Sequence, residues 1–290
     1  MTGSKMTGHS KHPSRAPCAL VALALLGLVG CPRHVRLERP YPAPSPAALR
    51  EALRARQQDL RALNGRVRAT SWMGGERVRA TVLVLAERPG RLRLEAQVTL
   101  QGTVAVLATD GARFAFLDTR KNELRRGPAC PANVASLIRI PLSPPDVAAI
   151  LLGDAAVPDG STADDRVTWD GDLGVDVLDV PGPGTGRLRF GIRRLDGQRI
   201  QIVGVTAVGA GGALLWRVAF EDFVEVPSST GGQPGALSLP GTIRFADGAT
   251  SFDEGVEIDF KERTVNDPAA PEAFVLATPP GVTAVEVGCP

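Results

Sequence analysis

The stretch RLRLEAQV, residues 91–98, alternates strictly between polar and apolar side chains. Every second residue from Leu92 to Val98 is apolar, so an extended chain places these side chains on one face. RLRFGIR at 187–193 and VEIDFK at 256–261 repeat the pattern. Strands with one apolar and one polar face are typical of an antiparallel sheet that has one side in water.

Ten further segments are predicted to be strands, and turn pairs such as Asp110-Gly111 separate several of them. About twelve strands in one chain must curl or close. The ten segments are 66–73, 76–86, 103–109, 112–118, 166–170, 174–180, 198–208, 213–226, 237–246 and 272–277.

Helices are predicted at three places. Ser45 is a good N-cap and a proline follows it, which predicts a helix over about 46–62. Residues 131–140 are predicted to form a short helix. A relative of the capping box begins at Ser143 and predicts a second short helix that ends at Gly153.

The composition excludes several kinds of functional site. All three histidines lie within the first 34 residues, so the predicted domain has none for a Ser-His-Asp site or a His-ligated zinc. The stretch 159–170 lacks the glycine that a calcium loop needs. We therefore predict no catalytic residue, no metal and no cofactor. Without residues 1–30 the net charge falls from +2 to −1, which argues against a nucleic-acid partner.

The first thirty residues are typical of a signal peptide. Lys5, Lys11 and Arg15 precede an apolar run at 18–30 that is too short to span a bilayer. The run ends in LVGC, which resembles the lipobox of bacterial lipoproteins, so Cys31 is predicted to be acylated. An ordinary secretory leader followed by an incidental cysteine is the alternative. An acylated Cys31 would anchor the chain to a membrane.

The residues after Cys31 suggest a location and a division of the chain. Pro32 follows the cysteine, which resembles the pattern of lipoproteins on the periplasmic face of the outer membrane. Five prolines in residues 32–46 predict an extended tether. The predicted division is a signal peptide at 1–30, the lipidated cysteine and Pro-rich tether at 31–46, and a β domain at 47–290.

Four stretches resemble the LolA/LolB superfamily of bacterial lipoprotein carriers and receptors. They are LNGRVRAT at 63–70, ATDGARFAFLDTRKNELRRGPA at 108–129, IPLSPPDVAAILLG at 140–153 and PEAFVLATPPG at 271–281. The resemblance implies a mainly β fold, a strongly curved antiparallel incomplete barrel of about 11–12 strands. It also implies an N-terminal helix and a short helical lid over an apolar cavity that holds the acyl chains of lipids or lipoproteins.

The resemblance and the alternation together give candidate residues for this cavity. The alternative is that the same residues form a packed core, because periodicity does not distinguish a filled barrel from a hollow one. The candidate lining is Leu92, Leu94, Phe114, Phe116, Leu188, Phe190 and Ile192, and the candidate lid is Val147, Ile150 and Leu151.

Two cysteines remain once Cys18 leaves with the leader and Cys31 is acylated. Cys130 and Cys289 form an even pair in a compartment that oxidises thiols, so a disulfide between them is predicted. The alternative is two separate thiols.

Three functions compete at this point. The first is a non-catalytic lipoprotein that binds lipid or lipoprotein acyl chains in envelope trafficking. The second is an accessory lipoprotein that uses the same shell to bind an envelope protein, as in stress sensing or a structural role. A hydrolase is the third, and the lack of histidine and of a paired nucleophile and base argues against it.

Overall fold

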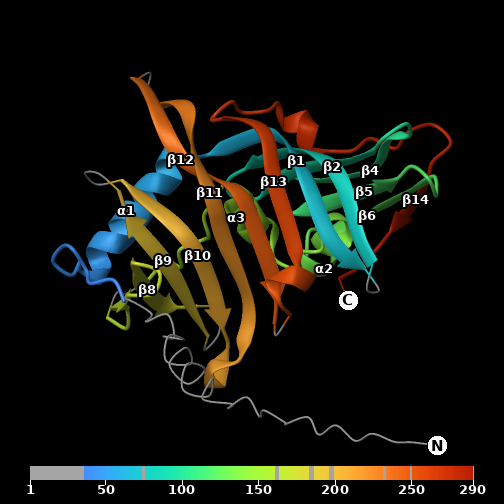
Figure 1. Cartoon of the computed structure of the whole chain (residues 1–290). Helices are drawn as coiled ribbons and strands as arrows, with labels where there is room; N and C mark the ends of the chain where they lie inside the picture. Colours follow the sequence, from blue (N-terminus) through green and yellow to red (C-terminus); the bar gives the residue numbers. More distant parts are fainter. Residues whose placement is uncertain are drawn as a thin grey trace, which may run out of the picture.

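The computed structural model describes residues 36–73, 76–160, 163–182, 186–195, 199–230, 233–248 and 250–289. They form one 14-stranded sheet in the order β14-β6-β5-β4-β3-β2-β1-β13-β12-β11-β10-β9-β8-β7. Two antiparallel meanders meet where β1 pairs with β13. The sheet curves strongly but does not close, because β14 and β7 are the edges of this order (Figure 1). The predicted incomplete barrel is confirmed.

The strands follow one another closely along the chain. Their bounds are β1 Ala62–Met73, β2 Glu76–Glu87, β3 Arg91–Val98, β4 Gly102–Thr109, β5 Arg113–Asp118, β6 Glu123–Pro128, β7 Arg166–Asp170, β8 Val175–Pro181, β9 Arg187–Arg194, β10 Ile200–Val208, β11 Leu214–Thr230, β12 Gln233–Asp247, β13 Val256–Val265 and β14 Thr283–Glu286.

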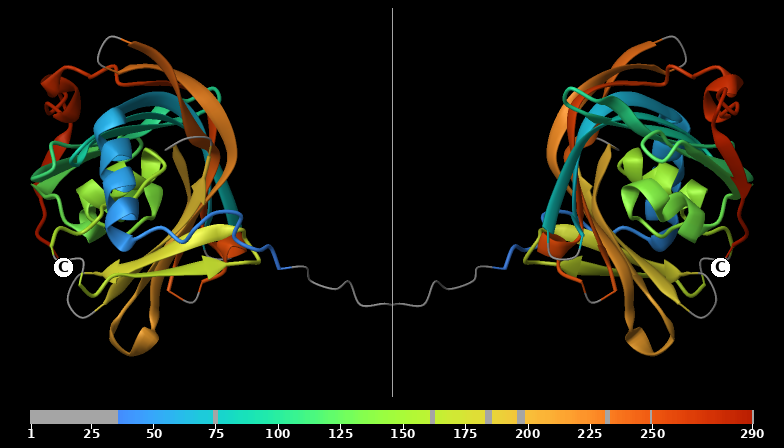
Figure 2. Two further views of the ribbon diagram at one scale, coloured as in Figure 1. Left: turned by 90° about the vertical axis from the view of Figure 1, so that its left-hand side faces the viewer. Right: turned by 90° about the vertical axis from the view of Figure 1, so that its right-hand side faces the viewer.

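Three α-helices, α1 Pro46–Asp59, α2 Pro131–Ile138 and α3 Pro144–Leu151, lie inside the curve of the sheet (Figure 2). The Ser45 hydroxyl caps α1 by accepting from the Ala48 amide at 3.2 Å. The first helix is shorter than predicted because Leu60 is already extended, with φ −124° and ψ 99°. Short 3-10 turns lie at Ala210–Gly212, Phe252–Glu254 and Pro271–Phe274.

The C-terminal part departs from the prediction. The predicted strand at 272–277 is wrong, because Pro271 starts a 3-10 turn that directs Phe274 into the core. The C-terminal strand instead comes later, as β14, and it pairs in parallel with β6. Neither β6 nor β14 was among the predicted strands. Gly127 permits this pairing, since a Cβ there would lie 2.1 Å from the Val287 carbonyl oxygen.

The core lies between the concave face of the sheet and the helices. Leu49 and Leu53 of α1, Val147 and Ile150 of α3, and Phe190 of β9 are fully buried there. Burial of each such side chain contributes about 1.5–3 kcal/mol. These contacts fix α1 and α3 against the sheet.

Buried ion pairs hold the helices and loops in place. Arg50 of α1 makes a bidentate pair with Asp165, at 2.5 and 2.9 Å, and donates to the Pro158 carbonyl. Arg88 makes a second pair with the buried Asp154, at 2.7 Å, just after α3. Such pairs fix geometry, because loss of one partner leaves a buried charge.

The second half of the predicted tether lies against the domain. The Trp169 indole donates to the Leu37 carbonyl at 2.7 Å, and Arg39 pairs with the buried Asp176 at 2.9 Å. The Tyr41 hydroxyl also donates to Asp176, at 3.2 Å. The chain is therefore attached to β7 and β8 from about residue 36, where proline content alone predicts an extended spacer. The predicted signal peptide and Cys31 lie outside the described residues.

The predicted disulfide between Cys130 and Cys289 is confirmed. It closes a separation of 159 residues with Cα atoms 6.1 Å apart. Asn133 of α2 also donates to the Gly288 carbonyl, at 3.3 Å. The last residues are thus fixed at the start of α2.

Among the helices of the described ranges, none combines the length and the apolar character that crossing a bilayer requires.

Candidate functional site

A cavity of about 450 Å³ lies between the sheet and the two short helices. One wall is the concave face of β1 to β5 and β13, and the other is the end of α2 with Leu151 of α3. Its volume is in the range of small-molecule sites. The apolar and small side chains that line it are Val67, Ala69, Val78, Ala80, Val82, Val84, Leu94, Ala96, Val98, Val104, Ala105, Phe116, Leu137, Ile138, Leu151, Val256 and Ile258.

Small side chains on the concave face explain why the space between the sheet and the helices is not filled here. Ala69 of β1 lies opposite Ala80 of β2, and Ala96 of β3 lies opposite Ala105 of β4. Four neighbouring strands thus each present an alanine to the cavity. A close-packed interior would need larger side chains at these positions.

The cavity has a closed end and a mouth. Val84 and Leu94 lie at the closed end and are at most 1% exposed. Val78 and Val98 lie near strand ends and are 43% and 38% exposed. The next turn carries Leu100 with its side chain wholly in solvent. The walls therefore change from dry to exposed toward the turns β1–β2 and β3–β4.

Charged side chains gather at the mouth. Arg79 comes from β2, Arg120 and Lys121 come from the β5–β6 turn, Arg125 comes from β6 and Arg139 follows α2, and all five line the cavity. Asp118 is the only acidic residue of the described chain in that lining. The opening is therefore positively charged, while the rest of the lining is mainly apolar and includes the hydroxyl residues Thr70, Ser71 and Ser136.

The predicted lining divides into two sets. Leu94, Phe116 and Leu151 line the cavity. The others lie in the packed core: four of them next to the cavity in β3, β5 and α3, and three on the far half of the sheet in β9. These core residues are Leu92, Phe114, Val147, Ile150, Leu188, Phe190 and Ile192.

Sequence reasoning missed the contributions of β1, β2 and β13. Val67, Val82 and Ile258 follow the same alternation as the predicted residues, and each is buried on the concave face. One sequence feature distinguishes this half of the sheet from the packed half. Small residues lie opposite small residues on neighbouring strands, as Ala96 and Ala105 do.

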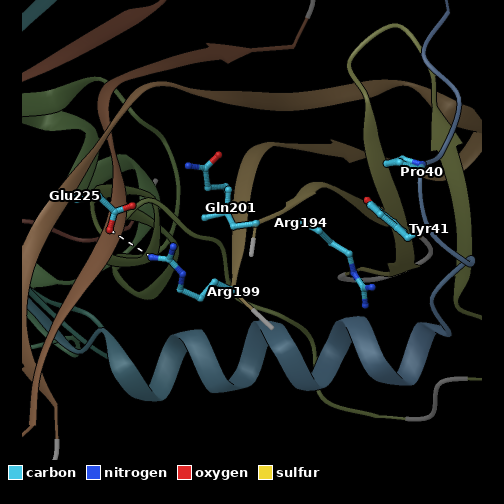
Figure 3. Close-up of a pocket in the computed structure, with 7 residues that line it drawn as sticks. Pro40, Tyr41, Arg194, Arg199, Gln201 and Glu225 are labelled. Atoms are coloured by element: carbon cyan, nitrogen blue, oxygen red, sulfur yellow. Dashed lines mark hydrogen bonds and ion pairs between the residues drawn. The ribbon is translucent and has the colours of Figure 1, made fainter. Parts of the chain in front are cut away.

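A second hollow, of about 620 Å³, is lined by the segment around Tyr41 and by residues of β9, β10 and β11 (Figure 3). Arg194 lies over the Tyr41 ring at 5.1 Å, and Arg199 pairs with Glu225 at 3.5 Å. Burial and the nearby Asp176 raise the pKa of Tyr41. The cations of this hollow thus already have partners, and its walls are more polar than those of the cavity.

Two buried charged residues, Asp154 and Arg56, lie outside the lining of the cavity. Burial raises the pKa of Asp154, an effect that Arg88 and Arg56 partly offset. Burial likewise lowers the pKa of Arg56, whose guanidinium lies 3.4 Å from the Gly153 and Ser238 carbonyl oxygens. The ion pair of Asp154 and the carbonyl contacts of Arg56 indicate that both residues have a structural role. Within the described ranges, no three His, Cys, Asp or Glu residues are grouped to hold a metal ion.

Comparisons with known proteins give structural relatives. No protein-family model matches the chain, and no curated protein matches it in sequence. A DUF1329 family protein from Desulfovibrio piger is similar in structure, with TM-score 0.53 and 14% identity over 80% of this chain and 98% of that one.

Two further solved structures are more distant. One, from Vibrio parahaemolyticus, carries the name of an outer membrane lipoprotein-sorting protein domain (TM-score 0.49, 11% identity, 79% of this chain and 95% of that one). The other is a LolA superfamily protein from Nitrosomonas europaea (TM-score 0.45, 14% identity, 78% and 97%). Identity this low shows the fold alone. The chain therefore shares its overall fold with the DUF1329 family protein. Its order of a helix, a run of strands, two helices and a second run of strands agrees with the order that the sequence resemblance implies.

Proposed function

We propose that this protein is a non-catalytic lipoprotein that binds a lipid or lipoprotein acyl chain in the cavity between the sheet and α2. The observation that carries the proposal is the cavity itself, whose lining away from the cations is mainly apolar. An acyl chain gains about 0.8 kcal/mol for each methylene that leaves water, and it needs no polar partner. The resemblance of four sequence stretches to the LolA/LolB superfamily supports the same function.

The proposed location is the periplasmic face of the outer membrane. LVGC at the end of the leader supports acylation of Cys31, and Pro32 supports the outer-membrane location. The Cys130–Cys289 bond fits an oxidising compartment outside the cytoplasm. The mouth, with its exposed Val78, Val98 and Leu100, is then the end through which a chain enters.

Titration of the mature protein with a fluorescent fatty acid tests the binding function. We expect one saturable site per chain, from which an unlabelled fatty acid displaces the probe. Absence of any saturable binding contradicts the proposal, and favours the accessory role in which the shell binds an envelope protein.

Metabolic labelling with a fatty acid tests the anchor separately. Cys31→Ser should abolish the label and leave the precursor uncleaved, because the acylated sulfur is missing. A label of equal strength in the variant would refute the anchor and leave the cavity function untouched.

A further inference from the structure

We infer that the cavity selects an amphiphile that has a single acyl chain and an anionic headgroup, with the headgroup bound by the cations at the mouth. This rests on the proposed function, since it names the class of ligand for the same cavity. Three features carry it: the place of Arg125, the excess of cations at the mouth, and the room inside.

Arg125 is built into the wall at the point where the apolar surface ends. It lies directly opposite Phe116 in the β5–β6 pair, and its guanidinium sits over the Phe116 ring at 5.0 Å. Its Nε is buried and makes no hydrogen bond with the described part of the chain, although Glu123 lies 3.2 Å away. An anion at the mouth would supply an acceptor to this guanidinium while its chain contacts Phe116.

The other cations outnumber the acids around the opening. Arg120 is exposed in the β5–β6 turn and forms no ion pair with any described residue. Lys121 lies 3.9 Å from Asp118, but that carboxylate already accepts from the backbone amides of residues 120 and 121, at 3.0 and 3.1 Å. Arg79 of β2 and Arg139, which follows α2, add two further positive charges to the lining.

The size of the cavity limits the ligand to one chain. A methylene occupies about as much space as a water molecule in the liquid, roughly 30 Å³. The volume of about 450 Å³ therefore holds roughly 15 such groups. That is one acyl chain, so the headgroup must remain at the mouth beside Arg120 and Arg125.

The second hollow does not offer the same combination. Arg194 and Arg199 have an aromatic and a carboxylate partner there, as Arg125 has, but the walls of that hollow are more polar and offer an acyl chain less apolar surface (Figure 3). The binding of an anionic amphiphile should accordingly depend on the mouth residues, and not on these two arginines.

The test compares two ligands that each carry one fourteen-carbon chain and whose headgroups differ in charge. The mature protein is titrated by calorimetry with tetradecyl phosphate, which is anionic, and with monomyristoylglycerol, which is neutral, both below their micelle concentrations. We expect the phosphate to bind about tenfold more tightly, as one charge-assisted contact provides. Raising the salt concentration should reduce this preference, because charges at an exposed mouth are screened.

Two variants and one control locate the effect. Arg125→Met keeps an unbranched apolar stem over Phe116, and Arg120→Glu reverses an exposed charge. Each should reduce the preference for the phosphate to about twofold or less, and should leave affinity for the neutral ligand unchanged. Arg193→Glu, on an exposed position of β9 outside the cavity, should change neither affinity.

The possible outcomes separate the two proposals. Equal binding of both ligands to the wild type, or a preference that survives both mouth variants, overturns the selection for an anion and leaves the acyl cavity in place. Binding of neither ligand overturns the proposed function itself. Inorganic phosphate should displace tetradecyl phosphate only weakly. Displacement at equal concentration would show a simple anion site, and would refute the requirement for a chain.

Discussion

Filling the cavity without changing its polarity should weaken ligand binding strongly while preserving the fold. Ala96 of β3 is buried, lines the cavity and lies opposite another alanine, Ala105, so an Ala96→Phe side chain would project into free space. The ring displaces roughly four methylenes of a bound chain, at about 0.8 kcal/mol each. The loss of about 3 kcal/mol corresponds to a rise in Kd of about a hundredfold.

Fluorescent fatty-acid titration measures this Kd, and thermal unfolding of the ligand-free protein is followed in parallel. The Tm should hold or rise, because an added apolar group that fills a hole restores packing. Ala55→Phe makes the same substitution on an exposed position of α1, outside the lining of the cavity, and should leave Kd unchanged. Undiminished binding by Ala96→Phe, or an equal loss in Ala55→Phe, would refute the assignment of the ligand to this cavity.

Three further predictions concern the frame around the cavity. Thiol titration of the denatured, unreduced mature protein should find no free cysteine, and two free thiols per chain would disprove the bond. Replacing Cys130 and Cys289 by serine should lower the free energy of unfolding by up to about 5 kcal/mol, which is the loop-entropy value for a separation of 159 residues. Asp165→Ala should cost about 3–5 kcal/mol in urea unfolding because it strands the buried Arg50, whereas Glu262→Ala, in an exposed pair with Arg66, should cost at most about 1 kcal/mol; similar costs would contradict the structural role of the buried pair. Hydrogen bonds from the amides of Arg113 and then Ala112 lower the pKa of Asp110 below its ordinary 3.8. The Asp110 carboxylate therefore stabilises the β4–β5 turn above pH 3.8, and this stabilisation is lost as the pH falls through the lowered pKa. The difference in unfolding free energy between wild type and Asp110→Ala should shrink at acid pH, and a difference that stays constant would contradict this role of Asp110.

Strands with clear alternation were predicted from the sequence, whereas strands that form because of pairing with their neighbours were missed. RLRLEAQV alternates and forms β3 as predicted, since one of its faces is buried. ELRRGP carries two adjacent arginines and still forms β6, because its neighbour β5 and the C-terminal β14 supply hydrogen bonds on both sides. β14 itself is short and exposed, so its place depends on the disulfide and on Gly127 rather than on any local pattern.

The site was predicted only in part, for a physical reason. Alternation identifies every residue that faces inward, and Phe190 and Phe116 satisfy it equally. Whether such a residue meets a helix or a free space depends on the volumes across several strands. That information is distributed over four strands, β1 to β4, each of which contributes one alanine. No one of these strands, taken alone, shows that a cavity lies beside it.

Native mass spectrometry of the protein extracted gently from its own membranes tests the central claim most directly. We predict one acyl lipid of negative headgroup charge bound per wild-type chain, and its absence from Ala96→Phe prepared in the same way. A wild-type chain that is folded but empty, or a lipid retained equally by Ala96→Phe, would contradict the claim that this cavity is the binding site.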